Sequence, residues 1–258
     1  MPAATPRPDY GIDAPGVIRN LFLVAAIGLL TWGTTFAGLW SGIVGTSNVR
    51  IDLAHTLLWP GLGCLIMAVW MTWDSKFGKV RRREVLLGRL RWTGAEQVLD
   101  VGCGRGLMLI GAAKRLTTGT ATGIDIWQSE DLSGNRPEAT LENAAREGVA
   151  DRVKVETADM RKLPFDDATF DVIVSCAAIH NLYEAGDRAK AIAEIGRVLK
   201  PGGHVLIDDI RHGGEYMRGL TAAGCEARRI DSRVGSVLLT LLSFGALRPV
   251  TLLAKKSG

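Results

Sequence analysis

The stretch Val98-Leu-Asp-Val-Gly-Cys-Gly-Arg-Gly106 decides the fold of this 258-residue chain. An apolar run over 97–101 predicts a buried parallel strand, and three glycines then lead into a helical pattern over 107–116. Glycines at such a turn permit positive φ and let a ligand lie against bare backbone. A second strand over 120–125 ends on Asp125, a carboxylate placed to accept hydrogen bonds from ribose hydroxyls. The pattern therefore predicts a site for a cofactor that contains a nucleoside.

The spacing of the glycines separates two classes of nucleoside cofactor. A dinucleotide fingerprint, G-x-G-x-x-G, would need its third glycine at position 107, which is occupied by Leu107. The loop reads G-x-G-x-G instead, with Asp100 two residues before the first glycine. This pattern resembles the first motif of the class I S-adenosylmethionine-dependent methyltransferases. The resemblance implies S-adenosyl-L-methionine as the cofactor and methyl transfer as the activity.

The resemblance extends through residues 98–207. The segment 158–174 is similar to the family's third and fourth motifs, and 198–207 is similar to its helix-turn-strand signature before the fifth strand. Four matches in the right order and spacing imply a methyltransferase fold rather than a dehydrogenase.

Strand and helix patterns alternate along the same part of the chain. Strands are expected over 97–101, 120–125, 153–157, 170–176, 204–208, 225–230 and 250–254, and helices over 79–90, 107–116, 137–147, 188–199 and 215–223. This alternation predicts an α/β fold, and the resemblance implies a Rossmann-like, doubly wound, mostly parallel seven-stranded sheet. Ligands of such sheets lie beyond the carboxyl ends of the strands, where the motifs cluster.

The resemblance also implies which residues bind the methionine and ribose parts of the cofactor. Gly102, Gly104 and Gly106 would permit its close passage. Asp100 matches the acidic residue that helps to hold the ammonium group, directly or through water. Asp125 would accept the ribose hydroxyls, with a helix cap at the strand end as the alternative.

The adenine end would be bound by residues from later motifs. Ile126 is expected against the adenine face, and Asp159 matches the position that usually receives the adenine amino group, with Met160 beside it. Asp159 could instead simply make a turn. Ser175, at the end of the fourth strand, is expected to face the cofactor and the incoming acceptor.

Three candidate catalytic residues follow the fourth and fifth strands. His180 could act as a general base near neutral pH, and Tyr183 could orient the acceptor. A histidine that only bridges loop backbones is the alternative for His180. Asp208, paired with Asp209, could position a nucleophile, although one of the two could be a structural cap. Methyl transfer from a sulfonium often needs only alignment and desolvation, so a base is not required.

Two uncharged runs precede the methyltransferase-like region. Residues 20–40 and 54–73 are each about the length that crosses a ~30 Å hydrocarbon layer as a helix. Tryptophans lie at or near their ends, where indole rings favour the membrane interface. We therefore expect a transmembrane helical hairpin ahead of the α/β domain. A buried hairpin in a soluble protein and a cleaved signal peptide are the alternatives considered.

The charges indicate an orientation for this hairpin. Seven Lys and Arg residues follow the second run within 76–91, whereas the connection 41–53 carries one Arg and one Asp. The positive-inside rule then places the catalytic domain and both termini in the cytoplasm of a two-helix, multi-pass membrane protein. The chain has a formal net charge of +4, and much of this excess lies in the basic segment. We expect the segment to bind membrane lipids, and no nucleic acid is expected.

These observations predict four regions. They are a flexible segment over 1–16, the hairpin over 17–74, a basic juxtamembrane linker helix over 75–95 and the catalytic domain over 96–258. The four cysteines show no metal-type spacing, so no metal site is expected. An apolar stretch over 234–247 is too short to span a bilayer and is expected to be either a buried hairpin or a dip into the lipid interface.

The expected function is that of a membrane-anchored methyltransferase whose acceptor is a lipophilic or membrane-associated small molecule. An anchor would be unnecessary for a polar acceptor that diffuses freely. A membrane-tethered methyltransferase of a protein or peptide is the first alternative. A non-catalytic S-adenosylmethionine-binding scaffold is the second, although its cofactor motifs are intact.

Overall fold

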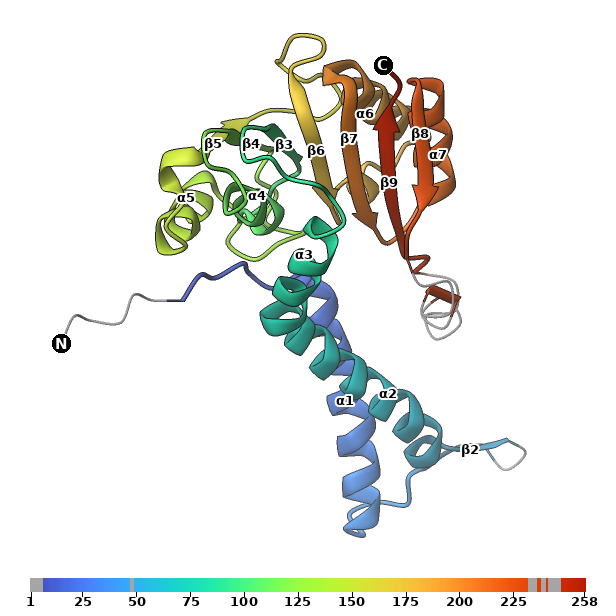
Figure 1. Cartoon of the computed structure of the whole chain (residues 1–258). Coiled ribbons are helices and arrows are strands. Elements are labelled where there is room, and N and C mark those ends of the chain that lie inside the picture. The colour runs from blue at the N-terminus through green and yellow to red at the C-terminus, as the bar shows by residue number, and fades with distance from the viewer. Residues whose placement is uncertain (1–6, 47–48, 232–235, 238–239, 241–246) are drawn as a thin grey trace, which may run out of the picture. The chain divides into compact units, whose positions relative to one another are not determined.

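The computed structural model describes residues 7–46, 49–231, 236–237, 240 and 247–258. The chain divides into two compact units (Figure 1). One unit comprises Gly11–Lys79 with Ser129–Ser133, and the other comprises Met1–Tyr10, Val80–Gln128 and Gly134–Gly258.

The first unit is built on two long helices, α1 (Pro15–Phe36) and α2 (Leu53–Trp73). A short antiparallel ribbon of β1 (Ile43–Gly45) and β2 (Arg50–Asp52) joins them. The helices approach closely at a pair of glycines, where a Cβ added to Gly28 would lie 2.5 Å from the Leu57 carbonyl oxygen. Glycine at this crossing permits the backbone contact that small residues provide between packed apolar helices.

Most apolar side chains of this unit face outward. Two helical stretches, Pro15–Phe36 and Leu53–Leu87, are long and apolar enough by length and composition to cross a membrane, and only 17% of each one's most apolar window is buried. Phe36 and Trp59 are 80% and 72% exposed. The test by length and composition does not by itself distinguish a membrane span from another apolar helix. After α2 the chain passes through a π-helical turn, Asp74–Gly78, into α3 (Lys79–Leu87).

The second unit contains a seven-stranded sheet in the order β5-β4-β3-β6-β7-β9-β8 (Figure 1). Its strands are β3 (Gln97–Val101), β4 (Thr120–Asp125), β5 (Val153–Thr157), β6 (Phe170–Cys176), β7 (Leu199–Asp209), β8 (Cys225–Arg229) and β9 (Val250–Lys256). All neighbouring pairs are parallel except those that involve β9, which is antiparallel to both β7 and β8. The predicted mostly parallel α/β sheet is confirmed.

The helices of this unit follow the predicted alternation with small shifts at their ends. They are α4 (Leu107–Ala113), α5 (Pro137–Arg146), α6 (Ala185–Val198) and α7 (Gly213–Ala222), with short 3₁₀ turns over Ala150–Arg152 and Ile179–Asn181. The fifth predicted strand, 204–208, is longer in the structure because Leu199 already pairs with Phe170 of β6. A register shift on the β6 side accommodates this early pairing.

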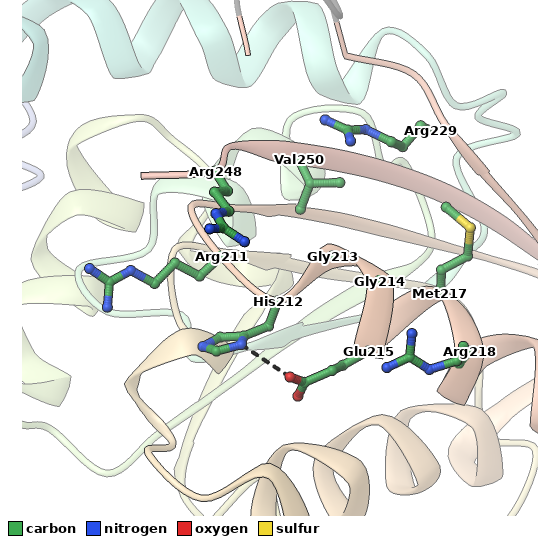
Figure 2. A pocket seen from close by; sticks show the side chains of 10 residues that line it. All are labelled: Arg211, His212, Gly213, Gly214, Glu215, Met217, Arg218, Arg229, Arg248 and Val250. Atoms are coloured by element: carbon green, nitrogen blue, oxygen red, sulfur yellow. Dashed lines mark hydrogen bonds and ion pairs between the residues drawn. The ribbon is translucent and has the colours of Figure 1, made fainter. Parts of the chain in front are cut away.

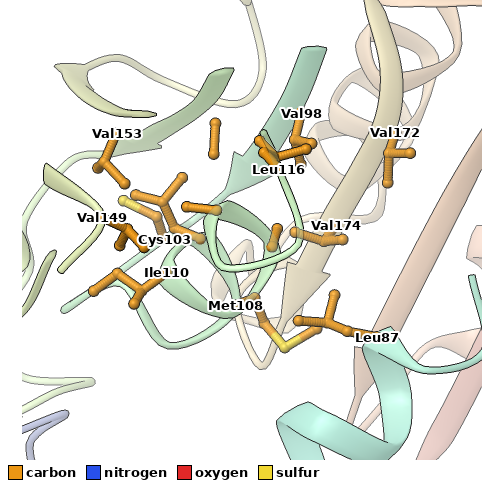
Figure 3. Close-up of a cluster of buried hydrophobic side chains, with 14 of the residues drawn as sticks. Leu87, Val98, Cys103, Met108, Ile110, Leu116, Val149, Val153, Val172 and Val174 are labelled. Atoms are coloured by element: carbon orange, nitrogen blue, oxygen red, sulfur yellow. The ribbon is translucent and has the colours of Figure 1, made fainter. Parts of the chain in front are cut away.

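Alternate residues of the central strands enter two hydrophobic cores. On one face Val98 and Val174 pack with Leu87 of α3 and Leu109 of α4 (Figure 3). On the other face Leu99, Val101 and Ile173 belong to a cluster that includes Ile192 of α6 and Leu220 of α7. Because successive side chains of a strand point to opposite faces, this division shows that helices cover both sides of the sheet.

Asp9 and Tyr10, ahead of the hairpin, have hydrogen-bond partners in the second unit. The Tyr10 hydroxyl donates to Glu147 Oε1 at 2.6 Å and accepts from an Arg83 Nη1 group at 2.9 Å. The backbone N–H of Asp9 donates to the Asn143 side chain at 2.9 Å, and that side chain donates back to the Asp9 carbonyl oxygen. Residues 9 and 10 are thus bonded to residues far along the sequence, while the flexibility expected for 1–16 stays a prediction.

Several cations of the basic segment after α2 have partners within the protein. Arg83 is buried and bonds to Tyr10, Glu84 and Glu147, and Arg82 forms an ion pair with Asp208. Lys79 donates to the Gly11 carbonyl oxygen and to Asp13. Three of the seven cations are thus used in intramolecular pairs. Most of the apolar stretch 234–247 lies outside the described residues.

Candidate cofactor and acceptor site

The glycine loop begins at the carboxyl end of β3 and leads into α4. Gly102, Gly104 and Gly106 have φ of +74°, +52° and +85°, in the left-handed region that favours glycine. Gly102 is also constrained by space, because a Cβ there would lie 2.3 Å from the Ala178 Cβ. The backbone N–H groups of Gly102 and Cys103 both donate to the Ile124 carbonyl oxygen, which fastens the loop to β4.

Asp125 at the end of β4 is bonded to this loop. Its Oδ2 accepts a hydrogen bond from the Gly104 backbone N–H at 2.8 Å, and its Oδ1 accepts one from the Trp127 N–H at 2.6 Å. The Asn135 amide nitrogen donates to the same Oδ1 at 3.3 Å, while the buried Asn135 Oδ1 makes no hydrogen bond within the described part of the chain. A fixed carboxylate and an unused buried acceptor therefore lie side by side.

Asp100 is almost fully buried beneath the loop. Its Oδ2 accepts a hydrogen bond from the Leu109 backbone N–H at 2.7 Å. Burial, assisted by the charge of Asp125, raises the pKa of the Asp100 carboxyl to about 8. No cation pairs with it among the described residues. A ligand ammonium group would compensate the desolvation of the ionised carboxyl.

The residues expected near adenine come from three segments. Ile126 is half exposed at the exit of β4, and the Met160 methyl group lies 3.5 Å from where a Cβ on Gly102 would be. Asp159 makes a turn, since its Oδ1 accepts from the Arg161 backbone N–H at 2.9 Å, and it pairs with the Arg161 guanidinium. Hydrogen bonding from Arg161 lowers the pKa of Asp159. Without a ligand, Asp159 therefore makes a turn, which was the alternative to its contact with adenine.

Ser175 differs from its expected orientation toward the ligands. It is buried, and its hydroxyl donates to the Val101 carbonyl oxygen at 2.8 Å, which ties β6 to β3. A strand residue in the middle of a sheet buried on both faces has little space for a ligand, and its hydroxyl finds a backbone partner instead.

The two adjacent aspartates at the end of β7 have separate partners. Asp208 accepts a hydrogen bond from the Thr251 hydroxyl at 2.6 Å and pairs with the Arg82 guanidinium at 2.9 Å. Burial raises the pKa of Asp208, and the positive charge of Arg82 opposes that shift. The expected catalytic role of Asp208 is therefore not matched by its surroundings, because its oxygens are bound to α3 and β9.

Asp209, its neighbour, holds the candidate histidine. The His180 Nδ1 lies 2.6 Å from Asp209 Oδ1, and the His180 backbone N–H donates to Oδ2. The buried Tyr216 hydroxyl donates to the same Oδ2 at 3.2 Å. Burial, assisted by the charge of Asp209, raises the pKa of Tyr216. Since a carboxylate only accepts hydrogen bonds, Nδ1 is the donor in this contact, and the neutral ring in this tautomer has its lone pair on Nε2.

Sequence reasoning placed Asp209 in a pair but selected Asp208 for catalysis. The alternation of side chains along a strand was the available signal, because only one of two adjacent residues can share a face with His180. Tyr183, the third expected catalytic residue, is 93% exposed just after the 3₁₀ turn. Its role in orienting an acceptor stays a prediction.

These features fit S-adenosylmethionine as the sequence led us to expect. The loop at Gly102 has no room for a Cβ, and Asp125 and Asn135 offer acceptors beside the loop for ribose hydroxyls. Asp100 is a buried acid whose ionisation an ammonium group would favour.

Comparisons with known proteins agree with this geometry. A family model described as a methyltransferase domain matches residues 99–207. The sterol 4-C-methyltransferase of Caenorhabditis elegans is 37% identical over 118 residues, which is 46% of this chain and 32% of that protein. The ubiquinone/menaquinone biosynthesis C-methyltransferase of Geotalea daltonii is 31% identical over 126 residues, or 48% of this chain and 50% of that protein.

Among solved structures, the YcgJ protein of Bacillus subtilis covers 69% of this chain and 99% of its own length, with a TM-score of 0.55 and 16% identity. That likeness shows the fold alone. The chain spans about a third to a half of the length of the first curated relatives it matches. Residues 99–207 are therefore similar to a methyltransferase domain, and the sheet that contains them has the fold of the solved structure.

Proposed function

We propose that this protein is a membrane-anchored methyltransferase that transfers a methyl group from S-adenosylmethionine to a lipophilic small molecule. The observation that carries the proposal is the presence, in one chain, of a methyltransferase domain and a helical hairpin whose apolar side chains are left exposed. Each component supports a separate part of the proposal.

The cofactor part rests on the loop between β3 and α4. Gly102, Gly104 and Gly106 would lie against the methionine and ribose, while Asp100 would face the ammonium group. Asp125 would accept the ribose hydroxyls, because each carboxylate oxygen has two lone pairs and the bonds to Gly104 and Trp127 use only part of them.

The transfer part rests on His180 and Asp209. When bound, the cofactor supplies an electrophilic methyl group on a sulfonium. The Asp209 carboxylate fixes the orientation of the His180 ring and its tautomer, so that Nε2 can receive a proton from an acceptor oxygen, nitrogen or carbon. Asp209 is a positioning residue in this scheme, because it acts through the histidine, and Tyr216 holds Asp209 in turn.

The anchor part rests on the length and surface of α1 and α2. A helix of 22 residues such as α1 is about 33 Å long, enough to cross a hydrocarbon layer of about 30 Å. The residues buried in these helices are mainly small or close to the glycine crossing, namely Ile18, Ala25, Gly28, Ala54, Gly61 and Ala68. Large apolar side chains therefore remain outside, which is unfavourable in water and favourable in lipid.

A lipophilic acceptor follows from the anchor and from the relatives. An enzyme held at a bilayer gains effective concentration only for an acceptor that is also in the bilayer. The two curated relatives described above are named for a sterol and for ubiquinone and menaquinone biosynthesis. The excess of Lys and Arg after α2 supports a cytoplasmic methyltransferase domain, where the cofactor is available.

The proposal is tested by release of S-adenosylhomocysteine from the full-length protein in lipid vesicles. We expect turnover when an organic extract of membranes is added, and background rates with a protein-only fraction. Turnover with the protein fraction alone would favour a protein acceptor. Cofactor binding without turnover in any fraction would favour a non-catalytic scaffold.

A further inference from the structure

A cavity of about 790 Å³ lies at the end of β7 (Figure 2). Ten residues line it: Arg211, His212, Gly213, Gly214, Glu215, Met217, Arg218, Arg229, Arg248 and Val250. They come from the segment after β7, the first turns of α7, the end of β8 and the start of β9. The cavity is therefore enclosed by elements that all belong to the methyltransferase unit.

The lining of this arginine pocket is strongly positive. Four of the ten residues are arginines, and the only acidic one, Glu215, pairs with Arg188 at 2.8 Å and contacts His212 at 3.3 Å. Arg229 is neutralised by Asp231 at 2.7 Å. Arg218 and Arg248 add further positive charge to the lining, which a bound anion would balance.

Two of these arginines have no partner. Within the described residues, the side chains of Arg218 and Arg248 make no hydrogen bond or ion pair. Arg218 projects from α7 and Arg248 precedes β9, so the two approach the cavity from different elements. Guanidinium groups with free N–H donors match the paired oxygens of phosphate groups in bidentate geometry.

The pocket is linked to the candidate base by a short series of contacts. The ring of His212, which lines the pocket, lies 6.4 Å from the ring of Tyr216. The Tyr216 hydroxyl donates to Asp209, and Asp209 binds His180. Tyr216 is fully buried, so these contacts run through the protein interior. Asp209 ends β7, and the pocket residues Arg211 and His212 follow it directly, so the pocket and His180 lie at the same edge of the sheet.

We propose that the arginine pocket binds a phosphate group carried by the methyl acceptor, and so orients the acceptor's apolar part toward His180. This inference rests on the proposed function, and it narrows the acceptor to a phosphorylated amphiphile. The phosphate would lie between Arg218 and Arg248, whose donors are otherwise unused, and no bond is made or broken at this pocket.

Binding can be measured without turnover. Full-length protein in dodecyl maltoside micelles, which contain no phosphate, is titrated by calorimetry with hexyl phosphate, hexanol and inorganic phosphate. We expect hexyl phosphate to bind at least about tenfold more tightly than inorganic phosphate, because the chain adds apolar burial, and hexanol to give no saturable binding. Equal affinity for hexyl phosphate and inorganic phosphate would overturn the assignment to an acceptor.

Two kinds of variant test the location of the site. Arg218→Gln combined with Arg248→Gln should weaken hexyl phosphate binding by about tenfold or more, whereas Arg228→Gln, next to the pocket arginine of β8, should not. Gly214→Leu should block the cavity, because Gly214 lines it and a side chain there would extend into its space. The only heavy atom near a Cβ at Gly214 is Arg218 Nη1, at 3.6 Å. Gly186→Leu in the first turn of α6, where a Cβ also meets open space, is its matched control.

The outcomes separate this inference from the proposed function. Unchanged hexyl phosphate binding in the double arginine variant and in Gly214→Leu would refute the pocket assignment, even if methyl transfer is observed. Affinity for S-adenosylhomocysteine, measured on the same samples, reports whether each variant is folded. Loss of hexyl phosphate affinity with that affinity retained supports the pocket, whatever the turnover.

Discussion

Gly104 and Asp125 are joined by a hydrogen bond of 2.8 Å, in which the backbone N–H of the glycine loop donates to the carboxylate at the end of β4. The bond connects two neighbouring parallel strands exactly where their carboxyl ends meet. It means that Asp125 shapes the loop as well as offering acceptors to a ligand. A substitution at this position should therefore affect both the cofactor contacts and the loop that makes them.

The first prediction concerns Asp125. Asp125→Ala should lower the affinity for S-adenosylhomocysteine by about tenfold to a hundredfold, since a hydrogen bond to a charged group is worth about 1.5–3 kcal/mol. Asp125→Asn, which can still accept from the Gly104 N–H, should lose less. Calorimetric titration measures both, with Asp166→Ala on the exposed loop before β6 as the control. Equal affinities in Asp125→Ala and the parent would remove Asp125 from the site.

The second prediction concerns His180 and the residue that positions it. His180→Gln should lower kcat by about a hundredfold or more if Nε2 removes a proton in the transition state. Asp209→Asn should lower kcat by a smaller factor and shift the pH–rate profile, because the ring loses the carboxylate that fixes its tautomer. Affinity for S-adenosylhomocysteine should stay within about twofold.

His204→Gln is the matched control for this pair, since His204 lies in the middle of β7, opposite Val172 of β6. An unchanged kcat in His180→Gln would show that alignment and desolvation suffice, and that His180 is a structural residue of the loop. A fall in kcat without a change of pH profile in Asp209→Asn would argue for a packing role of the carboxylate.

The third prediction uses the raised pKa of Asp100. In the free protein a pKa of about 8 keeps the carboxyl protonated at pH 7, whereas a bound ammonium group favours the ionised form. Binding of S-adenosylhomocysteine at pH 7 should therefore release most of a proton, because the free carboxyl is mainly protonated at that pH. The affinity should rise as the pH increases from 6 toward 8, since below pH 8 binding must expel that proton.

Calorimetry in buffers with different ionisation enthalpies measures the proton release. Asp100→Asn should abolish it and flatten the dependence of affinity on pH. Persistence of the same release in Asp100→Asn would mean that another group supplies the proton. An Asp100→Asn protein that binds as tightly as the parent at every pH would place the ammonium group elsewhere.

Much of the fold could be predicted because its signals are local. Strands β3, β4, β5 and β6 begin and end at the expected residues, since each is an apolar run or, for β5, an apolar–polar alternation, followed by turn residues. The glycine loop and Asp125 were found for the same reason: a left-handed turn needs glycine, and the carboxylate ends the neighbouring strand. Order along the chain is enough to place such features.

The parts that could not be predicted depend on partners distant in sequence. Arg82 pairs with Asp208 across 126 positions, and Tyr10 bonds to Glu147 across 137. A run of basic residues indicates a membrane surface as readily as it does buried ion pairs, and only the folded chain shows which cations are used. Alternation along β7 indicated that only one of Asp208 and Asp209 could face His180, but which of the two does so depends on the register of β7.

The last prediction concerns the hairpin and the compartment of the methyltransferase domain. If α1 and α2 cross a bilayer, a cysteine at Thr46, exposed after β1, lies outside the cell, and one at Ser257, near the C-terminus, lies inside. A membrane-impermeant maleimide should label Thr46→Cys in intact cells and Ser257→Cys only after permeabilisation, with the parent protein reporting any labelling of its four cysteines. Labelling of both before permeabilisation would place the domain away from the cytosolic cofactor. If neither cysteine is labelled until the cells are lysed, the hairpin does not cross the membrane. The argument for a lipophilic acceptor would then lose its main support.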